Sequence, residues 1–171
     1  MKKDISWNKI KSETKSIWAG ETDPFPYNTT QPSTVNSVAF NYKNIEEWVS
    51  VAKGDKKGHI YGRNTNPTVE VLEKKVAILE GAESATAFSS GMAAISNTMF
   101  ACLRPGDRVV VGKDTYGGTS KIFMEFLPNY NIDVVFCDTT DNEKFKNEID
   151  RKCELLYLET PTNPTLKVQD I

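Results

Sequence analysis

The strongest constraint on the fold is an alternation of helix-length and strand-length apolar segments, which begins near residue 66 of this 171-residue chain. Helical periodicity marks the longer segments, and short apolar runs rich in β-branched residues mark the shorter ones. The expected helices cover residues 67–80, 91–103, 118–127 and 142–149, and the expected strands cover residues 84–88, 108–112, 132–137 and 154–159. This alternation predicts an α/β fold with a mainly parallel, doubly wound sheet and helices on both faces.

Local signals support the expected elements. Asn66 is a favourable N-cap, Pro67 suits the first position of a helix, and Gly81 stands where a C-terminal glycine is preferred. The segment Arg108–Gly112 holds three consecutive valines, which predicts a strand that is buried on both faces. The chain stops soon after the expected strand at residues 154–159, so we expect the sheet to be incomplete at this C-terminus.

Residues 1–66 have a different composition, with many Thr, Asn, Pro and Lys residues and few periodic segments. Four apolar residues at helical spacing predict a short amphipathic helix, namely Trp7, Ile10, Ile17 and Trp18. A long irregular arm is difficult to bury against one small domain, so we expect it to lie over a partner subunit or another domain. The predicted organisation is an arm and inter-subunit segment at residues 1–66, followed by part of a sheet domain at residues 67–171.

The charge balance narrows the range of partners. The chain has 21 Lys and Arg against 23 Asp and Glu, a net charge of −2 that favours neither nucleic acid nor an anionic membrane as partner. The longest apolar run, residues 99–103, is far shorter than the ~18 residues of a membrane span. Three separated cysteines, Cys102, Cys137 and Cys153, predict reduced thiols in a cytoplasmic protein without a metal site. The single histidine, His59, is expected to be structural or at the surface.

Four loops carry residue types that bind anions or flat rings. The first loop, Ser89–Ala93, opens the expected helix at residues 91–103. Small residues let a ligand approach the backbone, and N–H groups at a helix start attract anions, so Ser90, Gly91 and Met92 are candidates for a phosphate cradle. The alternative is an ordinary serine N-cap. Neither GxGxxG nor GxxxxGK[ST] is present, which disfavours dinucleotide and nucleoside-triphosphate binding.

The other three loops each allow a functional and a purely structural interpretation. Tyr116, before two glycines, can stack on a flat ring, or it is a half-exposed tyrosine in a turn. Glu159 and Asn163 lie on a proline-stiffened loop that presents a carboxylate and an amide, or they belong to a simple connection. Arg63, with Tyr61 two residues before it, offers a planar fork for phosphate or carboxylate, or it is a solvated charge.

Together, the motifs YGRNTNPT, SSGMAA, DTYGGT and ETPTNPT resemble the Cys/Met-metabolism family of pyridoxal-phosphate enzymes. The resemblance extends from about residue 20 to the last residue, with the motifs in the order of the family. The family includes cystathionine γ-synthase, cystathionine γ-lyase, methionine γ-lyase and O-acylhomoserine sulfhydrylases. The resemblance implies pyridoxal 5′-phosphate as cofactor. It also implies that residues 67–171 form the N-terminal portion of the large domain of a fold-type-I enzyme.

The resemblance also implies roles for individual residues. The implied cofactor-binding residues are Tyr61, Arg63, Ser90, Gly91, Met92, Tyr116, Glu159 and Asn163. Among them, Tyr116 matches the tyrosine that stacks on the pyridine ring and assists proton transfer, and Asn163 matches the asparagine that meets the phenolic oxygen. Tyr61 and Arg63 match a pair that reaches the phosphate from the neighbouring subunit. The resemblance thus implies a homo-oligomer, a dimer with shared active sites or a tetramer, acting on a small amino acid.

Several parts of the family pattern do not occur in these 171 residues. In the family, three residues lie beyond the ETPxNP loop: the aspartate that pairs with the pyridine nitrogen, the aldimine lysine in a Ser-x-Thr-Lys pattern, and the arginine that holds the substrate carboxylate. Lys167 follows the loop too closely to be that lysine, and Lys121 belongs to the expected helix at residues 118–127. We therefore expect this chain to be a fragment or one half of a split enzyme, and to be inactive alone.

The implied parent enzyme is a pyridoxal-phosphate-dependent lyase or transferase of transsulfuration, acting by γ-elimination or γ-replacement on cystathionine or an O-acylhomoserine. Gly118 stands where methionine γ-lyases often carry cysteine, which disfavours that activity. Methionine γ-lyase and O-acetylhomoserine sulfhydrylase remain alternatives for the parent. Two other classes also stay open: an inactive remnant that serves as a dimerisation or interaction partner, and a phosphate-binding α/β module unrelated to pyridoxal phosphate.

Overall fold

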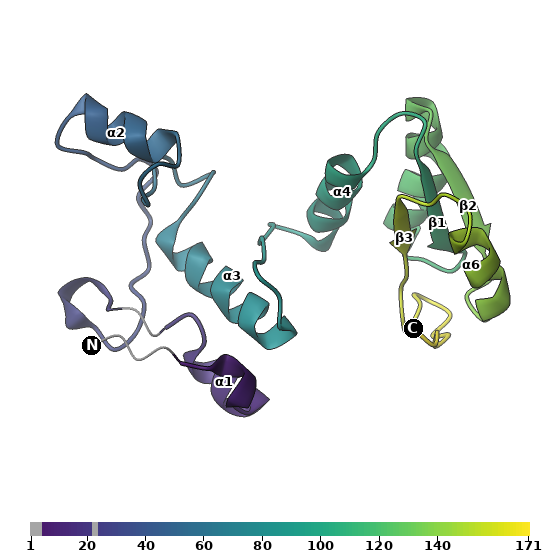
Figure 1. Ribbon diagram of the computed structural model, residues 1–171, viewed down its shortest axis with the longest axis horizontal. Helices are drawn as coiled ribbons and strands as arrows, with labels where there is room; N and C mark the ends of the chain where they lie inside the picture. Colours follow the sequence, from purple (N-terminus) through teal and green to yellow (C-terminus); the bar gives the residue numbers. More distant parts are fainter. Residues whose placement is uncertain (1–4, 22–23) are drawn as a thin grey trace. The chain divides into compact units, whose positions relative to one another are not determined.

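The computed structural model describes residues 5–21 and 24–171, in two compact units, Met1–Ala87 and Phe88–Ile171 (Figure 1). The first unit contains η1 (Trp7–Lys9), α1 (Ser12–Trp18), η2 (Pro26–Asn28), α2 (Ile45–Ala52) and α3 (Pro67–Glu80). The second contains α4 (Gly91–Cys102), β1 (Arg108–Gly112), α5 (Gly117–Lys121), η3 (Ile122–Phe126), η4 (Leu127–Tyr130), β2 (Asp133–Cys137), α6 (Asn142–Ile149) and β3 (Leu155–Tyr157). Within the described ranges, every helix is too short or too polar to span a lipid bilayer.

The sheet of the second unit has the strand order β2-β1-β3, and both outer strands run parallel to β1 (Figure 1). Val110, at the middle of β1, pairs in register with Val135 of β2 and with Leu156 of β3. Parallel neighbours require crossover connections, which α5, η3 and η4 supply between β1 and β2, and α6 supplies between β2 and β3. The predicted α/β class with a parallel sheet is therefore confirmed.

Strand β1 is the centre of the core because its successive side chains point to opposite faces of the sheet. Val109 and Val111 pack with Phe123 on one face, whereas Val110 packs with Phe145 of α6 on the other. All three valines are fully buried. Full burial of a side chain of this size contributes roughly 1.5–3 kcal/mol. The expectation that residues 108–112 form a strand buried on both faces is confirmed.

Residues 84–88 and 118–127 differ in the structure from the elements expected for them. Residues 84–88 are not a strand, because no strand in the described part of the chain offers them a ladder of hydrogen bonds. The helix expected at residues 118–127 begins as α5, continues through the π-helical turn η3, and tightens into the 3₁₀ helix η4. Pro128 has no N–H to continue the helical ladder, and Asn131 ends the segment in the left-handed conformation, with φ of 58°.

In the first unit, α1 is tied to α3 by a lysine. Lys75 Nζ donates hydrogen bonds to the Ile17 carbonyl oxygen at 2.9 Å and to the Glu21 carboxylate at 2.6 Å. Gly20 occupies the turn after α1 with φ of 77°, and a Cβ atom there would lie 2.7 Å from the Val71 carbonyl oxygen. Only glycine allows the turn to approach α3 this closely.

The arm is more regular than the sequence predicts. The expected N-terminal amphipathic helix is divided into η1 and α1, because Ile10 between them is extended. Helix α2 is not predicted, since eight residues form too short a window for a clear periodic pattern. Its N-cap is Asn44, whose side chain accepts a hydrogen bond from the Glu47 N–H at 2.9 Å. Residues 1–4 and 22–23 of the arm lie outside the described residues.

Helix α3 confirms the predicted signals at both ends. The Asn66 side-chain oxygen accepts a hydrogen bond from the Thr68 N–H at 2.8 Å, and Pro67 takes the first helical position. Asn66 also donates through Nδ2 to the Val35 carbonyl oxygen at 2.9 Å, which fastens the preceding arm to the helix start. Gly81 ends the helix in the left-handed conformation, with φ of 67°.

Candidate active site

Two loops of the second unit are joined by the carboxylate of Glu159. Its Oε2 accepts a hydrogen bond from the Tyr116 backbone N–H at 3.2 Å, and its Oε1 accepts one from the Asn163 backbone N–H at 3.0 Å. Tyr116 follows β1 and Glu159 follows β3, so both lie at the edge where these parallel strands end. Open α/β sheets bind their ligands at this carboxyl edge. The structure therefore brings Tyr116, Glu159 and Asn163 together where a ligand is expected.

The Tyr116 ring lies beside the start of α4. A Cβ atom at Gly118 would lie 2.9 Å from Cε1 of Tyr116 and 3.1 Å from Sδ of Met92, so the ring and the sulfur both crowd this position. The Thr119 hydroxyl also points to the Met92 sulfur, at 3.8 Å. Tyr116 is still 49% exposed, which leaves part of its ring open to a ligand. Gly118 thus permits the close approach of Tyr116 and Met92.

The start of α4 has the donors of an anion site. The Ser90 side-chain oxygen accepts a hydrogen bond from the Ala93 N–H at 3.1 Å, and the first intrahelical bond runs from the Ala94 N–H to the Ser90 carbonyl oxygen. The N–H groups of Gly91 and Met92 precede that bond, so they have no acceptor within the helix. Nothing lies within 4 Å of a Cβ atom built on Gly91. The N-cap interpretation of Ser90 is confirmed, and it is compatible with a phosphate at Gly91 and Met92.

A second carboxylate of the same edge, Asp114, pairs with Lys167. Lys167 Nζ lies 2.8 Å from Asp114 Oδ2, which also accepts a hydrogen bond from the Thr139 hydroxyl at 3.1 Å. The hydrogen bond from Lys167 lowers the pKa of Asp114, and the same bond raises the pKa of Lys167. Lys167 is therefore held as an ammonium group by its partner.

Tyr61 and Arg63 belong to the first unit, where they form a pair of their own. The Arg63 guanidinium carbon lies 4.8 Å from the centroid of the Tyr61 ring, a cation–π contact. Tyr61 forms an antiparallel bridge with Ala39, and the Gly62 N–H donates to the Val38 carbonyl oxygen at 2.7 Å. The loop borders a hollow of about 420 Å³ that Arg63 also lines.

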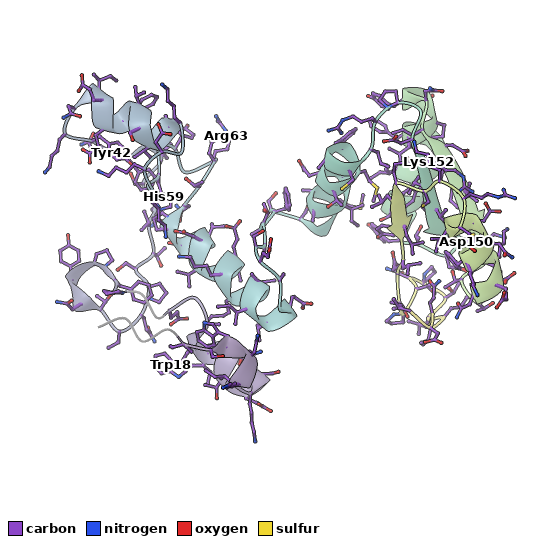
Figure 2. All side chains as sticks on the ribbon, viewed as in Figure 1. Trp18, Tyr42, His59, Arg63, Asp150 and Lys152 are labelled. Carbon is purple, nitrogen blue, oxygen red and sulfur yellow. The ribbon has the colours of Figure 1, made fainter. Side chains whose placement is uncertain are left out.

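The base of this loop is braced by Tyr42 and His59 (Figure 2). The Tyr42 hydroxyl donates to the His59 carbonyl oxygen at 2.7 Å and accepts from the His59 N–H at 3.1 Å. The imidazole Nδ1 lies 3.1 Å from the Thr65 hydroxyl, and Nε2 lies 3.7 Å from the Glu70 carboxylate. His59 thus connects its loop to α3, in agreement with the expected structural role.

The site residues from the sequence fall into two groups. The second unit contains Ser90, Gly91, Met92, Tyr116, Glu159 and Asn163, and the first contains Tyr61 and Arg63. Sequence reasoning missed the pairing of Asp114 with Lys167. Its only sequence signal is a carboxylate that follows a buried strand by two residues. The described residues contain no cluster of three or more His, Cys, Asp or Glu side chains suited to a metal ion.

At this carboxyl edge a helix start with unpaired N–H groups lies beside an exposed aromatic ring, a combination that suits a ligand with a phosphate and a flat ring. The sequence model of the Cys/Met metabolism PLP-dependent enzyme family matches residues 13–171, and the chain belongs to this family. The resemblance seen in the sequence and the expected cofactor, pyridoxal phosphate (PLP), are thereby confirmed.

Individual relatives have several activities. The chain is 44% identical over 117 residues to L-methionine gamma-lyase of Fusobacterium nucleatum subsp. polymorphum. The aligned residues cover 68% of this chain and 30% of that protein. It is 45% identical over 111 residues to cystathionine beta-lyase MetC of Bacillus subtilis, covering 65% of this chain and 28% of that protein. The solved structure of metB from Corynebacterium glutamicum matches with a TM-score of 0.84 and 35% identity, over 97% of this chain and 41% of that one.

These matches confirm the fold class, and they show that the chain spans less than half the length of the relatives it matches. The residues present fit the cofactor of the family. The open backbone at Gly91 and the N–H groups of Gly91 and Met92 suit its phosphate, and the exposed Tyr116 ring beside them suits its flat pyridine ring.

Proposed function

We propose that the whole protein is a PLP-dependent transsulfuration enzyme that performs γ-elimination or γ-replacement on cystathionine or an O-acylhomoserine. The observation that carries this proposal is the crowding of Tyr116 and Met92 at Gly118. It supports the proposal because the exposed Tyr116 ring lies near Met92, whose backbone N–H is unpaired at the start of α4, so one ligand with a phosphate and a flat ring can contact both. When bound, pyridoxal phosphate supplies an electron-withdrawing ring that acidifies the α-proton of an amino acid.

The residues of the second unit bind and orient. Gly91 and Met92 donate their backbone N–H groups to the cofactor phosphate, and the helix dipole of α4 favours the negative charge there. The Ser90 side-chain oxygen accepts the Ala93 N–H, which leaves the N–H groups of Gly91 and Met92 for the phosphate. Tyr116 stacks on the ring, and its phenolic oxygen accepts or returns a proton during the reaction.

Asn163 acts through its side-chain amide, which donates to the phenolic oxygen of the cofactor. Glu159 serves the cofactor indirectly, since both of its carboxylate oxygens accept backbone N–H groups from this loop and from the Tyr116 loop. Glu159 is thus a positioning residue in this proposal. Its charge keeps the two cofactor-facing loops together at the sheet edge.

Tyr61 and Arg63 serve a second copy of the protein. The planar guanidinium of Arg63 is suited to a phosphate oxygen pair, and the Tyr61 ring beneath it limits the positions it samples. The whole protein is then a homo-oligomer, a dimer at least, in which each site uses residues of both copies. The three thiols, Cys102, Cys137 and Cys153, fit a cytoplasmic location, where they stay reduced.

In this proposal the lysine that carries the cofactor lies outside these 171 residues, because none of their lysines stands in a Ser-x-Thr-Lys pattern after the ETPTNP loop. Lys167 is engaged by Asp114 as an ammonium ion, which makes it a poor nucleophile. We expect the 171-residue chain alone to be inactive for this reason. The alternative to a part of an active enzyme is an inactive remnant that serves only in dimerisation.

Methionine γ-lyase is the second candidate activity, because a relative of that name is 44% identical. Gly118 counts against it, because this position often carries a cysteine in methionine γ-lyases.

The deciding experiment uses the whole protein with pyridoxal phosphate. We expect an absorption band of a lysine-bound cofactor that borohydride fixes covalently, and release of cysteine together with 2-oxobutyrate and ammonia from cystathionine. Methanethiol release from methionine at a higher kcat/KM would favour the second candidate. Absence of any cofactor band in the whole protein would contradict the proposal and favour the remnant.

A further inference from the structure

Asp114 holds polar groups from two other segments of the sheet edge. Its Oδ2 accepts hydrogen bonds from Lys167 Nζ at 2.8 Å and from the Thr139 hydroxyl at 3.1 Å. Its Oδ1 is reached by the Thr165 hydroxyl at 3.4 Å. Thr139 follows β2, whereas Thr165 and Lys167 belong to the loop that follows β3. The carboxylate at the end of β1 therefore connects the ends of all three strands.

The segment that carries Lys167 is folded back on itself and closed by hydrogen bonds between its two ends. The Thr162 N–H donates to the Lys167 carbonyl oxygen at 2.9 Å, and the Lys167 N–H donates to the Thr162 hydroxyl oxygen at 2.9 Å. Thr162 is fully buried, and its hydroxyl lies 2.7 Å from that of Thr165. Asn163 lies inside this closed segment. We therefore expect a displacement of Lys167 to be passed on to Asn163.

Each of the two loops supplies a carboxylate that accepts hydrogen bonds from the other loop. Glu159, from the loop after β3, accepts the Tyr116 N–H of the loop after β1. Asp114, from the loop after β1, accepts the Lys167 ammonium and the Thr165 hydroxyl of the loop after β3. Contacts in both directions resist separation of the loops better than one contact does, because either loop must break a charged hydrogen bond to move.

We infer that Asp114 and Lys167 are positioning residues whose ion pair sets the placement of Tyr116 relative to Asn163. Neither residue has to touch the cofactor for this effect. The placement of two backbone loops is a property of the protein without ligand, whereas its consequence for the cofactor ring rests on the proposed function. The pair differs from an ordinary surface ion pair, since the Asp114 side chain is mostly buried and accepts hydrogen bonds from three side chains.

Amide hydrogen exchange of the whole protein without cofactor tests the inference. The variants are Asp114→Asn and Lys167→Met, which remove one charge each. The matched control is Lys152→Met, which removes the partner of Glu154 from an ion pair before β3, at the opposite end of that strand. We expect the Tyr116 and Asn163 amides to exchange about tenfold faster in both test variants and at the wild-type rate in the control.

The results separate the two proposals. Unchanged exchange at Tyr116 and Asn163 in Lys167→Met, with thermal unfolding showing a folded protein, would overturn the positioning role even if Asp114→Asn does not fold. In protein loaded with pyridoxal phosphate, we expect both test variants to weaken the induced circular dichroism of the cofactor band, and the control to keep it. If the test variants show the faster exchange but the wild-type protein retains no cofactor, the positioning role stands and the proposed function is contradicted.

Discussion

The Glu159 carboxylate accepts a hydrogen bond from the Tyr116 backbone N–H at 3.2 Å, although 43 residues separate them in the chain. The second carboxylate oxygen of Glu159 binds the Asn163 N–H, so a single side chain organises two backbone donors from different loops. Backbone groups at these positions would otherwise depend on water. The negatively charged carboxylate of Glu159 therefore holds these two loops together at the sheet edge.

Replacing Glu159 with Gln should loosen this arrangement. The amide keeps one oxygen acceptor but turns an NH₂ group toward one of the two backbone donors, Tyr116 or Asn163, which cannot accept it. We expect a fall in kcat of about tenfold with a smaller change in KM, because the substrate-binding groups are not removed. Steady-state kinetics of the whole protein measure both values. An unchanged kcat would show that the bridge has no role in turnover.

Replacing Tyr116 with Phe should separate stacking from proton transfer. The ring remains while the hydroxyl is lost, so we expect the cofactor content to stay at the wild-type level and kcat to fall roughly 10²-fold. Absorbance of the bound cofactor and initial rates give the two quantities. Tyr130→Phe, which changes an exposed tyrosine of η4, is the matched control and should retain full activity. Loss of cofactor in Tyr116→Phe would mean that the hydroxyl serves binding.

Mixing two inactive variants tests whether active sites are shared. Arg63→Ala damages the group proposed to reach the neighbouring site, whereas Tyr116→Phe damages the site of its own copy. In randomly mixed dimers, half are hybrids with one intact site each, so activity should recover to about a quarter of wild type. The assay follows activity after the two variants are unfolded and refolded together. Failure to exceed the sum of the separate variants would argue that each copy completes its own site.

Truncating Phe123 tests the core beneath the site. Its fully buried ring packs with Val109 and Val111, so Phe123→Ala should lower the free energy of unfolding by about 3–5 kcal/mol through lost contacts and a cavity. Urea denaturation of the whole protein measures the change. The neighbouring Met124 is exposed, so Met124→Ala should change stability by less than about 0.5 kcal/mol. Equal effects of the two substitutions would contradict the assigned core.

The pKa of Asp114 predicts a pH dependence of stability. Its hydrogen bond from Lys167 lowers the pKa in the folded protein, so the unfolded chain binds the proton more readily. The stabilisation is fully present above the unfolded-state pKa of about 3.9 and disappears as the pH falls through the lower folded-state pKa. We therefore expect the free energy of unfolding, measured with urea between pH 7 and pH 3, to fall less steeply with decreasing pH in Asp114→Asn than in wild type. Parallel curves would mean that the pair does not contribute.

Local sequence patterns determined much of this molecule. The N-cap of Asn66 and the left-handed Gly81 at the ends of α3 follow from side-chain hydrogen bonding and glycine geometry within one turn. The three consecutive valines of β1 predict its burial on both faces, since an apolar run cannot face water favourably on either side of the sheet. The four motifs identify the family without any structure, and the family model that matches residues 13–171 agrees with them.

Other features were decided only by tertiary structure. The strand order β2-β1-β3 and the absence of a strand at residues 84–88 depend on which segments pair, and propensity within one segment does not encode its partner. The pairing of Asp114 with Lys167 joins residues 53 apart. Such a contact forms because parallel strands end at the same sheet edge, where packing of their apolar faces brings distant loops within hydrogen-bonding distance.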